Sequence, residues 1–459
     1  MVEFHPLMYP LLAGTAVLGA LAGRLVWTRA KFSGTPGLVV GALCGVVGPL
    51  LAMKPIRSCA FEADRGGVDQ VIGAIIFVAG AALLLAVAGW IVNSVGRARG
   101  HVAARGDQFE KGSFRGYGPF PWLLLAPTLV VLVFFLYRPM TETFRLSMYK
   151  MRQGAPRTPF VCLDNYTTLV EPTIEWFAIV PTVLLIAAII GSVVLTRRNE
   201  PSPMLRRVRE LLLIVTVIAW ATSLFGDDYR GVFTTTTILT TGTVLLSLVF
   251  GLGIAVLVSQ KIRGRGIYRT FLIWPYAISP PIAGILFFVM FDPLAGIVGH
   301  FVETLTPWEL PNYKTDPTLA RGAVILASVW KTIGFSILFY IAGLQNVATE
   351  TLEAAEIDGA NKWQRFRHIT IPSLAPITFF LVISNVTYAF FDVFGTISLL
   401  TTGGPSRATT DAMYSLVQAA SDHGNFGDGA AQSIILFMMV LAVTGWQFRS
   451  TGRRVTYQR

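Results

Sequence analysis

Two charged residues lie deep within otherwise apolar stretches of the chain, Lys331 and Asp392. An ionised side chain at the centre of a bilayer costs about 2.5–3.5 kcal/mol on insertion scales, so such groups usually pair or face water. In one hypothesis they line a solute path, where the Lys331 ammonium would bind an anionic group such as phosphate. Asn385 and Tyr388 would then offer hydrogen bonds to the same solute. In the alternative the two charges pair, or Asp392 simply reaches the membrane surface.

A polar loop at 346–371, NVATETLEAAEIDGANKWQRFRHITI, offers a second kind of chemistry. Its first half predicts a short helix, with Thr349 or Thr351 as the N-cap and acidic residues in the first turn. Gly359 is the predicted C-terminal cap, because a glycine there can adopt a positive φ. The small side chains of this helix would let it approach a partner closely.

The second half of the loop predicts an amphipathic helix that ends at Pro372. Apolar residues recur every third position against basic ones, with Trp363, Phe366 and Ile369 set against Lys362, Arg365 and Arg367. A bent two-helix element of this kind suits docking into a groove on a soluble partner. An ordinary amphipathic loop at the membrane surface is the alternative.

The composition decides which solvent surrounds these residues. Of the 459 residues, 53% are hydrophobic and 14% charged, whereas a soluble domain carries about 25% charged residues. A mean hydropathy of +0.59 excludes disorder. Three cysteines cannot form a disulfide scaffold or a four-ligand zinc site, and the five histidines show no metal spacing. A membrane protein without a metal site is therefore expected.

Apolar stretches long enough to cross a bilayer recur along the chain. About 20 residues of helix are needed for each crossing. The sequence predicts an all-α, polytopic protein with about eleven transmembrane helices, at 8–27, 36–53, 71–94, 122–138, 174–195, 210–226, 233–258, 271–292, 322–345, 372–395 and 430–448. The threonine-rich helix among them, 233–258, is expected to pack against protein, because its hydroxyls can bond to a neighbouring helix.

The net charge of +11 is explained by topology. With the N-terminus outside and the C-terminus cytoplasmic, the segments inside carry 23 Lys and Arg and those outside carry 12. Positive residues concentrate on the cytoplasmic side of membrane proteins. This orientation is therefore predicted, and no nucleic-acid partner is needed to explain the basic charge.

The chain divides into three parts. Residues 1–95 predict a three-helix extension, 96–119 a basic cytoplasmic linker, and 120–459 the main membrane domain, with a helix hairpin inserted at about 174–226. Glycines at four-residue intervals in the extension predict close helix contact, at Gly19, Gly23, Gly37, Gly41 and Gly45.

The loop also carries a resemblance to a known family. Its residues match the EAA motif of permease subunits in binding-protein-dependent ABC importers, at Glu353, Ala354, Ala355, Asp358, Gly359, Ala360, Ile369, Ile371 and Pro372. Other stretches within 120–172 and 233–459 resemble the MalF-like branch of sugar and glycerol-phosphate permeases. The pieces YAFFDVF, TTGGPSRATT and VTYQ look most like the glycerol-3-phosphate permease subunits.

The resemblance implies a type I ABC importer permease core of six helices in a prokaryotic inner membrane, to which the extension and the hairpin are additions. It implies that the EAA loop, with Phe366, couples this chain to ATPase subunits that bind ATP and Mg. The implied partners are a second homologous permease subunit, two ATP-binding subunits, an extracytoplasmic solute-binding protein and membrane lipid. The outside loops 138–173 and 396–429 would contact the binding protein.

The implied solute is glycerol-3-phosphate or a related glycerophosphodiester, with a mono- or oligosaccharide as the alternative. The chain has no G-x-x-x-x-G-K-[ST] phosphate loop, so ATP hydrolysis by that route must occur on separate chains, and no cofactor is expected in this one. A secondary transporter or channel is the rival from another class. A membrane-embedded enzyme ranks last, because no nucleophile motif or paired carboxylates lie in the spans.

Overall fold

The computed structural model describes most of the chain and divides it into two units, Met1–Asn165 and Tyr166–Arg459, which are considered separately. Its described part is helical, and one isolated antiparallel bridge, between Tyr149 and Phe160, is the strand-like feature found there. The all-α class is therefore confirmed. The described residues are 8–29, 34–61, 67–103, 120–155, 158–171, 176–197, 203–260, 264–293, 295–305 and 311–451.

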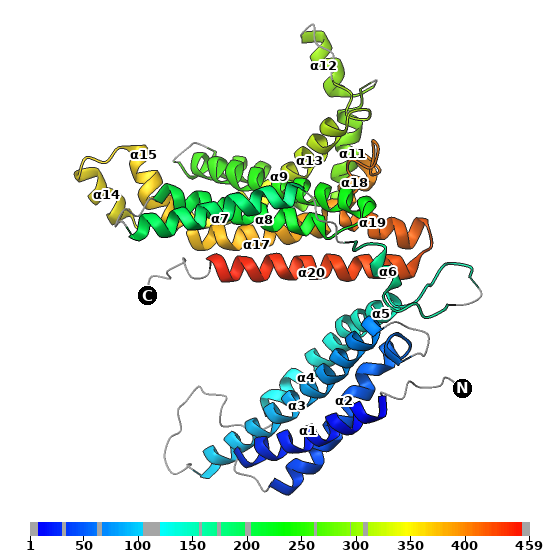
Figure 1. Ribbon diagram of the computed structural model, residues 1–459. Helices are drawn as coiled ribbons and strands as arrows, with labels where there is room; N and C mark the ends of the chain where they lie inside the picture. The colour runs from blue at the N-terminus through cyan, green and yellow to red at the C-terminus, as the bar shows by residue number, and fades with distance from the viewer. Residues whose placement is uncertain are drawn as a thin grey trace. The chain divides into compact units, whose positions relative to one another are not determined.

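Three long helices form the first part of the first unit: α1 (Met8–Arg29), α2 (Gly34–Phe61) and α3 (Gly67–Ala103) (Figure 1). The backbones of α1 and α2 touch where glycines face each other. A Cβ added to Gly41 would lie 2.1 Å from the carbonyl oxygen of Gly19. The predicted close helix contact is confirmed, because no side chain larger than hydrogen fits there.

The helix α3 continues to Ala103, beyond the expected start of the basic linker at residue 96. The rest of that linker, 104–119, lies outside the described residues. A further helical run then consists of α4 (Phe120–Leu132), a π-helical turn η2 (Val133–Tyr137) and α5 (Arg138–Leu146).

Cys162, in the loop after α5, is buried and disulfide-bonded, whereas Cys44 is a free thiol. In the predicted topology Cys59 and Cys162 both lie outside the membrane, so the sequence allows a disulfide between them. The side chain of Cys59 lies outside the described part of the structure.

In the second unit, the helices α7 (Trp176–Arg197) and α8 (Pro203–Ser223) pack together as a hairpin. The indole Nε1 of Trp220 donates a hydrogen bond of 2.9 Å to Oγ1 of Thr182 across the pair. This pairing agrees with the hairpin expected at 174–226. Its basic turn, 198–202, lies outside the described residues. A short helix α6 (Asp164–Thr167) precedes the hairpin.

The centre of the second unit is built by α9 (Asp227–Ser259), α13 (Pro317–Gln345), α17 (Ala375–Phe391) and α20 (Phe426–Thr451) (Figure 1). The threonine-rich face of α9 is buried, as predicted, and Ser247 shares a hydrogen bond of 2.7 Å with Thr332 of α13. Apolar side chains fill the remaining space in two clusters along these helices.

The expected span 271–292 is broken in two. A first piece, α10 (Arg265–Ile273) followed by the 3₁₀ turn η3 (Trp274–Ala277), meets α11 (Pro280–Met290) at an angle of 103°. Ile278 and Ser279 are extended, and Pro280 and Pro281 have no N–H groups for a continuing helix. The segment is therefore a bent pair of helices, and its crossing of the membrane as one span stays a prediction.

Shorter elements complete the unit: α12 (Ile297–Leu305), α14 (Thr349–Ile357), α15 (Lys362–Arg365), η4 (Phe366–Thr370), α16 (Ile371–Ser373), α18 (Val393–Leu400), α19 (Ala412–Val417) and η5 (Gln418–Asp422). Over the described residues, six helices are long and apolar enough to cross a membrane, or eight if each of two bent pairs is one span. Three shorter apolar helices lie where three further spans are expected. The count of eleven stays a prediction.

Candidate functional site

The polar loop at 346–371 forms the expected pair of short helices, and its first helix starts earlier than expected. The N-cap of α14 is Ala348, with extended backbone and no side-chain hydrogen bond. The prediction of Thr349 or Thr351 as the cap is wrong, because Thr349 is already helical. Glu350 in the first turn faces the positive end of the helix instead.

A compact reversal ends α14 where the sequence places it. Gly359 has a φ of +82°, in the left-handed region. The N–H of Ala360 donates to the carbonyl of Ala355 at 2.9 Å, and the N–H of Gly359 donates to that of Glu356 at 3.0 Å. These two bonds define a Schellman cap, which satisfies the last carbonyls of the helix. The predicted role of Gly359 is confirmed.

The second helix begins with a capping box that sequence reasoning missed. Oδ1 of Asn361 accepts a hydrogen bond from the N–H of Gln364, and Oε1 of Gln364 accepts one from the N–H of Asn361, both at 2.8 Å. The spacing of a small polar residue and a glutamine three positions later was the available signal. This box fixes the direction in which the chain leaves the turn at Gly359.

The helical run continues past Pro372 rather than ending there. The N–H of Ile371 bonds to the carbonyl of Phe366, so 366–370 is a π-helical turn. Pro372 has no N–H to offer the carbonyl four residues before it, and a wider turn accommodates this loss. The run then bends by 64° into α17 at Leu374, which is buried.

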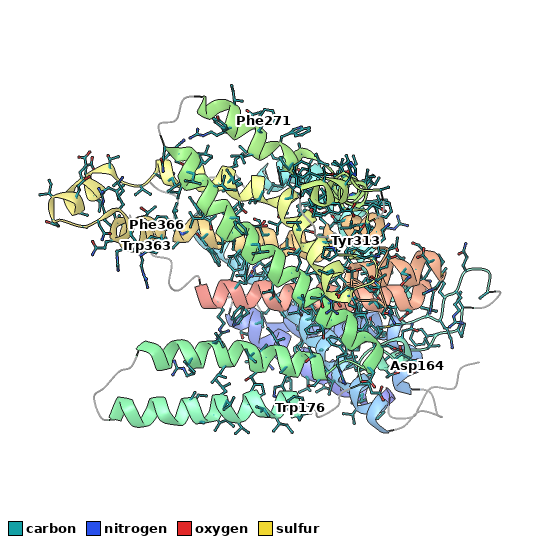
Figure 2. All side chains as sticks on the ribbon, turned by 90° about the horizontal axis from the view of Figure 1, so that it is seen from above. Asp164, Trp176, Phe271, Tyr313, Trp363 and Phe366 are labelled. Carbon is teal, nitrogen blue, oxygen red and sulfur yellow. The ribbon has the colours of Figure 1, made fainter. Side chains whose placement is uncertain are left out.

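Large apolar side chains project from this element. Ile357 is 87% exposed and Trp363 is 64% exposed. The rings of Trp363 and Phe366 lie 5.7 Å apart at one end of the unit (Figure 2). Nη1 of Arg365 pairs with Oε2 of Glu356 at 2.5 Å, joining the two helices. The result is a rigid, bent surface with both apolar and charged groups.

The lysine predicted in the membrane is buried between aromatic rings. Lys331 of α13 is 6% exposed. Its Nζ lies 4.5 Å from the ring centroid of Tyr388 and 5.4 Å from that of Tyr276. Rings at these distances attract a cation through their quadrupoles. Tyr276, from the broken span, was missed, and its position between Pro275 and Pro280 was the only signal for it.

The remaining members of the candidate path, Asn385 and Asp392, differ in burial. Asn385 is buried, and its Nδ2 donates to Oγ of Ser336 at 3.1 Å. Asp392 is exposed, at the junction of α17 and α18. The ion pairs of the described residues do not include one between Lys331 and Asp392. The structure thus brings Lys331 and Tyr388 into contact, and it leaves Asp392 near enough for its charge to act on Lys331.

The hydroxyl of Tyr388 is buried and has no hydrogen-bond partner among the described residues. A buried hydroxyl without a partner has lost its hydrogen bonds to water, and no other hydrogen bond offsets that free-energy cost. The ammonium of Lys331 and the hydroxyl of Tyr388 therefore form a polar pair. Within the described part of this chain, the hydroxyl remains available to bind a further group.

Residues 247–448 match the family of the binding-protein-dependent transport system inner membrane component. The chain is 40% identical over 238 residues to the sn-glycerol-3-phosphate transport system permease protein UgpA of Agrobacterium fabrum. This alignment covers 51% of this chain and 79% of that protein. The chain belongs to this family. The protein of the same name from Brucella suis is 41% identical over 219 residues, 47% of this chain and 73% of that one.

The permease is also similar in fold to two solved structures. One is a bacterial ABC transporter that imports the acidic polysaccharide alginate, with a TM-score of 0.51 and 18% identity. The other is the alginate transporter in complex with a pentasaccharide-bound periplasmic protein, with a TM-score of 0.52 and 17% identity. Each alignment covers 74% of this chain and 96% of the other.

The family match contains the loop and both tyrosines around Lys331, and it lies wholly within the second unit. The permease is therefore a multi-pass membrane protein whose role is transport, and the helices α1 to α3 are additional to the matched region.

Proposed function

We propose that this permease forms the transmembrane path for glycerol-3-phosphate or a related glycerophosphodiester in an ABC importer. The observation that carries the proposal is the 40% identity to a glycerol-3-phosphate permease, which extends over 79% of that protein. The buried ammonium of Lys331 supports an anionic solute, because a lysine is a suitable point charge for phosphate.

The solute path runs past Lys331 and Tyr388 in this proposal. The ammonium binds the phosphate, and the unpartnered hydroxyl of Tyr388 donates to one of its oxygens. Tyr276 holds the ammonium in place while the solute is absent. Asn385 positions α17 against α13 through Ser336. Asp392 lies at the mouth of the path.

The bent element at 349–373 docks into a cleft of an ATP-binding subunit. Its rigid caps at Gly359 and Asn361 would transmit a movement without unfolding, and its exposed Ile357 and Trp363 supply apolar contact. The motif residues Glu353, Ala354, Ala355, Asp358, Ala360, Phe366, Ile369 and Pro372 belong to this surface. ATP and Mg bind to the partner chains.

The assembly contains a second permease subunit, two ATP-binding subunits and a solute-binding protein. The family description, a component of binding-protein-dependent transport systems, supports the last of these. The N-terminus lies outside and the C-terminus in the cytoplasm, as the distribution of Lys and Arg supports.

The test is solute-stimulated ATP hydrolysis by the complex reconstituted in proteoliposomes with its binding protein. Glycerol-3-phosphate or a glycerophosphodiester is expected to stimulate hydrolysis, and maltose and glycerol are not. If maltose alone stimulates hydrolysis, the solute is a sugar and not a glycerophosphate. Uptake that persists without any ATP-binding subunit would show that the protein is a secondary transporter or channel.

A further inference from the structure

The connection between α11 and α13 contains a short helix, α12, with two distinct faces. Projected down the helix axis at 100° per residue, its apolar residues occupy one continuous arc of about 140° and its polar residues the other side. The apolar arc contains Ile297, Val298, Phe301, Val302 and Leu305, and the other side contains Gly299, His300, Glu303 and Thr304. We propose that α12 lies in the membrane surface, with this apolar arc in the lipid.

Three of the five residues in the apolar arc are exposed, and Val298 and Val302 are half-buried. Ile297 is 69% exposed, Phe301 63% and Leu305 65%. Figure 1 shows α12 standing clear of the helices at the centre of its unit, at a steep slant to α9 and α20. A helix parallel to those two would cross the bilayer, whereas one that turns away from them at the end of a span can lie along its surface.

The connection to α11 is tight, so α12 cannot lie far from the membrane. The N–H of Gly296 donates to the carbonyl of Asp292 at 2.9 Å, and the N–H of His300 donates to that of Gly296 at 3.1 Å. The turn leaves no room for a side chain, since a Cβ on Gly296 would lie 2.4 Å from the Asp292 carbonyl oxygen. The helix α12 therefore starts seven residues after the end of α11, directly after this turn.

An ion pair lies at the end of α11, close to the start of the connection to α12. Nζ of Lys314 pairs with Oδ2 of Asp292 and lies 4.3 Å from the ring centroid of Phe288. This contact ties the returning chain to the end of α11. A lysine whose ammonium contacts both a carboxylate and the face of an aromatic ring suits the boundary between hydrocarbon and water.

The membrane helix that precedes α12 also exposes apolar side chains. On α11, Ile282 is 52% exposed and Val289 54%. Between α11 and the start of α13 lies a shallow pocket of about 260 Å³, whose walls are apolar and include Phe291, Leu319 and Leu326. Because the same kind of surface covers the spans and α12, the occupant that both share is bilayer lipid.

The test uses the full chain, with a photoreactive side chain placed on either face of α12. Variants carry p-benzoylphenylalanine at Ile297, Phe301 or Leu305, and matched controls carry it at His300, Glu303 or Thr304. Each is reconstituted in vesicles of phosphatidylethanolamine and phosphatidylglycerol, with and without the partner subunits, and illuminated. Adducts are identified by mass spectrometry.

Phospholipid adducts are expected to be several-fold more abundant at the three apolar positions than at the three controls, whether or not the partner subunits are present. Equal yields on the two faces would overturn the proposal. Adducts from Phe301 to a second permease subunit or to the binding protein, at the expense of lipid, would also overturn it and would identify α12 as a protein interface. Transport activity does not enter the readout, so the result is independent of the proposed solute.

Discussion

Arg365 reaches back across the turn at Gly359 to pair with Glu356, with 2.5 Å between Nη1 and Oε2. The pair joins α14 to α15. Its glutamate is largely exposed, and exposed ion pairs contribute little stability by themselves. The angle between the two helices therefore depends on the backbone caps at Gly359 and Asn361, which makes those residues the ones to change.

Gly359→Val is expected to lower solute-stimulated ATP hydrolysis strongly while the protein still reaches the membrane. The left-handed region costs a residue with a Cβ roughly 1–2 kcal/mol of conformational free energy, and a β-branched residue is disfavoured further. No neighbouring atom would contact the new Cβ, so the effect comes from φ alone. Hydrolysis by the reconstituted complex is the measurement.

Gly359→Asn is the matched control, because asparagine tolerates a positive φ. It should retain most of the stimulated rate. A valine variant with the normal rate, or an asparagine variant as inactive as valine, would contradict the role assigned to this turn.

Lys331→Met is expected to reduce uptake of glycerol-3-phosphate far more than uptake of a neutral solute. Methionine keeps the length and apolar stem of the side chain and removes the ammonium that would bind phosphate. Tyr388→Phe should give a smaller loss in the same direction, because it removes only the unpartnered hydroxyl. An equal loss for charged and neutral solutes would exclude a phosphate-specific role for the lysine.

Gly41→Val should destabilise the helices α1 to α3. The new side chain would start 2.1 Å from the carbonyl oxygen of Gly19, and overpacking typically costs about 1–3 kcal/mol. Gly14→Val is the control, since a Cβ there meets nothing within 4 Å. Limited proteolysis in detergent should show faster cleavage of the first variant only. Equal resistance of both would contradict close contact between α1 and α2.

Asp411 should make stability depend on pH. Its carboxylate caps α19 by accepting the N–H of Tyr414 at 2.7 Å. Burial raises the pKa of this carboxyl from 3.8 to about 7, although that hydrogen bond opposes the shift. The folded state therefore holds the proton more tightly than the unfolded chain, and its stability falls as the pH rises from about 4 to about 7.

Asp411→Asn keeps a capping side chain and removes the titration. In detergent, the thermal midpoint of this variant should decrease less between pH 5 and pH 7.5 than that of the unchanged protein. The control Asp228→Asn replaces an exposed carboxylate and should leave this decrease as it is. An unchanged pH profile in the first variant would contradict the raised pKa.

The sequence was most informative where chemistry is local. The cap at Gly359 and the glycine contacts in the extension follow from the conformational freedom and small size of glycine, and both are found. The predicted start of α14 was wrong. Ala348 caps the helix through extended backbone without a side-chain hydrogen bond, and no residue type indicates such a cap in a sequence.

The structure differs most from the sequence-based expectations where distant segments meet. The bend at Ile278 depends on two prolines and on the close approach of Gly395, whose added Cβ would lie 2.8 Å from Pro281. That bend carries Tyr276, and Tyr276 lies against Lys331 on another helix. Sequence spacing contains no distance between helices, so this third group around the lysine could not be predicted.

The central claim is that the loop at 349–373 transmits ATP-driven movement to the membrane helices. It is tested most directly by ATP hydrolysis of the reconstituted complex carrying Glu353→Lys, with and without solute-loaded binding protein. The expected result is a complex that assembles in the membrane and whose hydrolysis no longer responds to solute. Stimulated hydrolysis at the wild-type rate would contradict the claim.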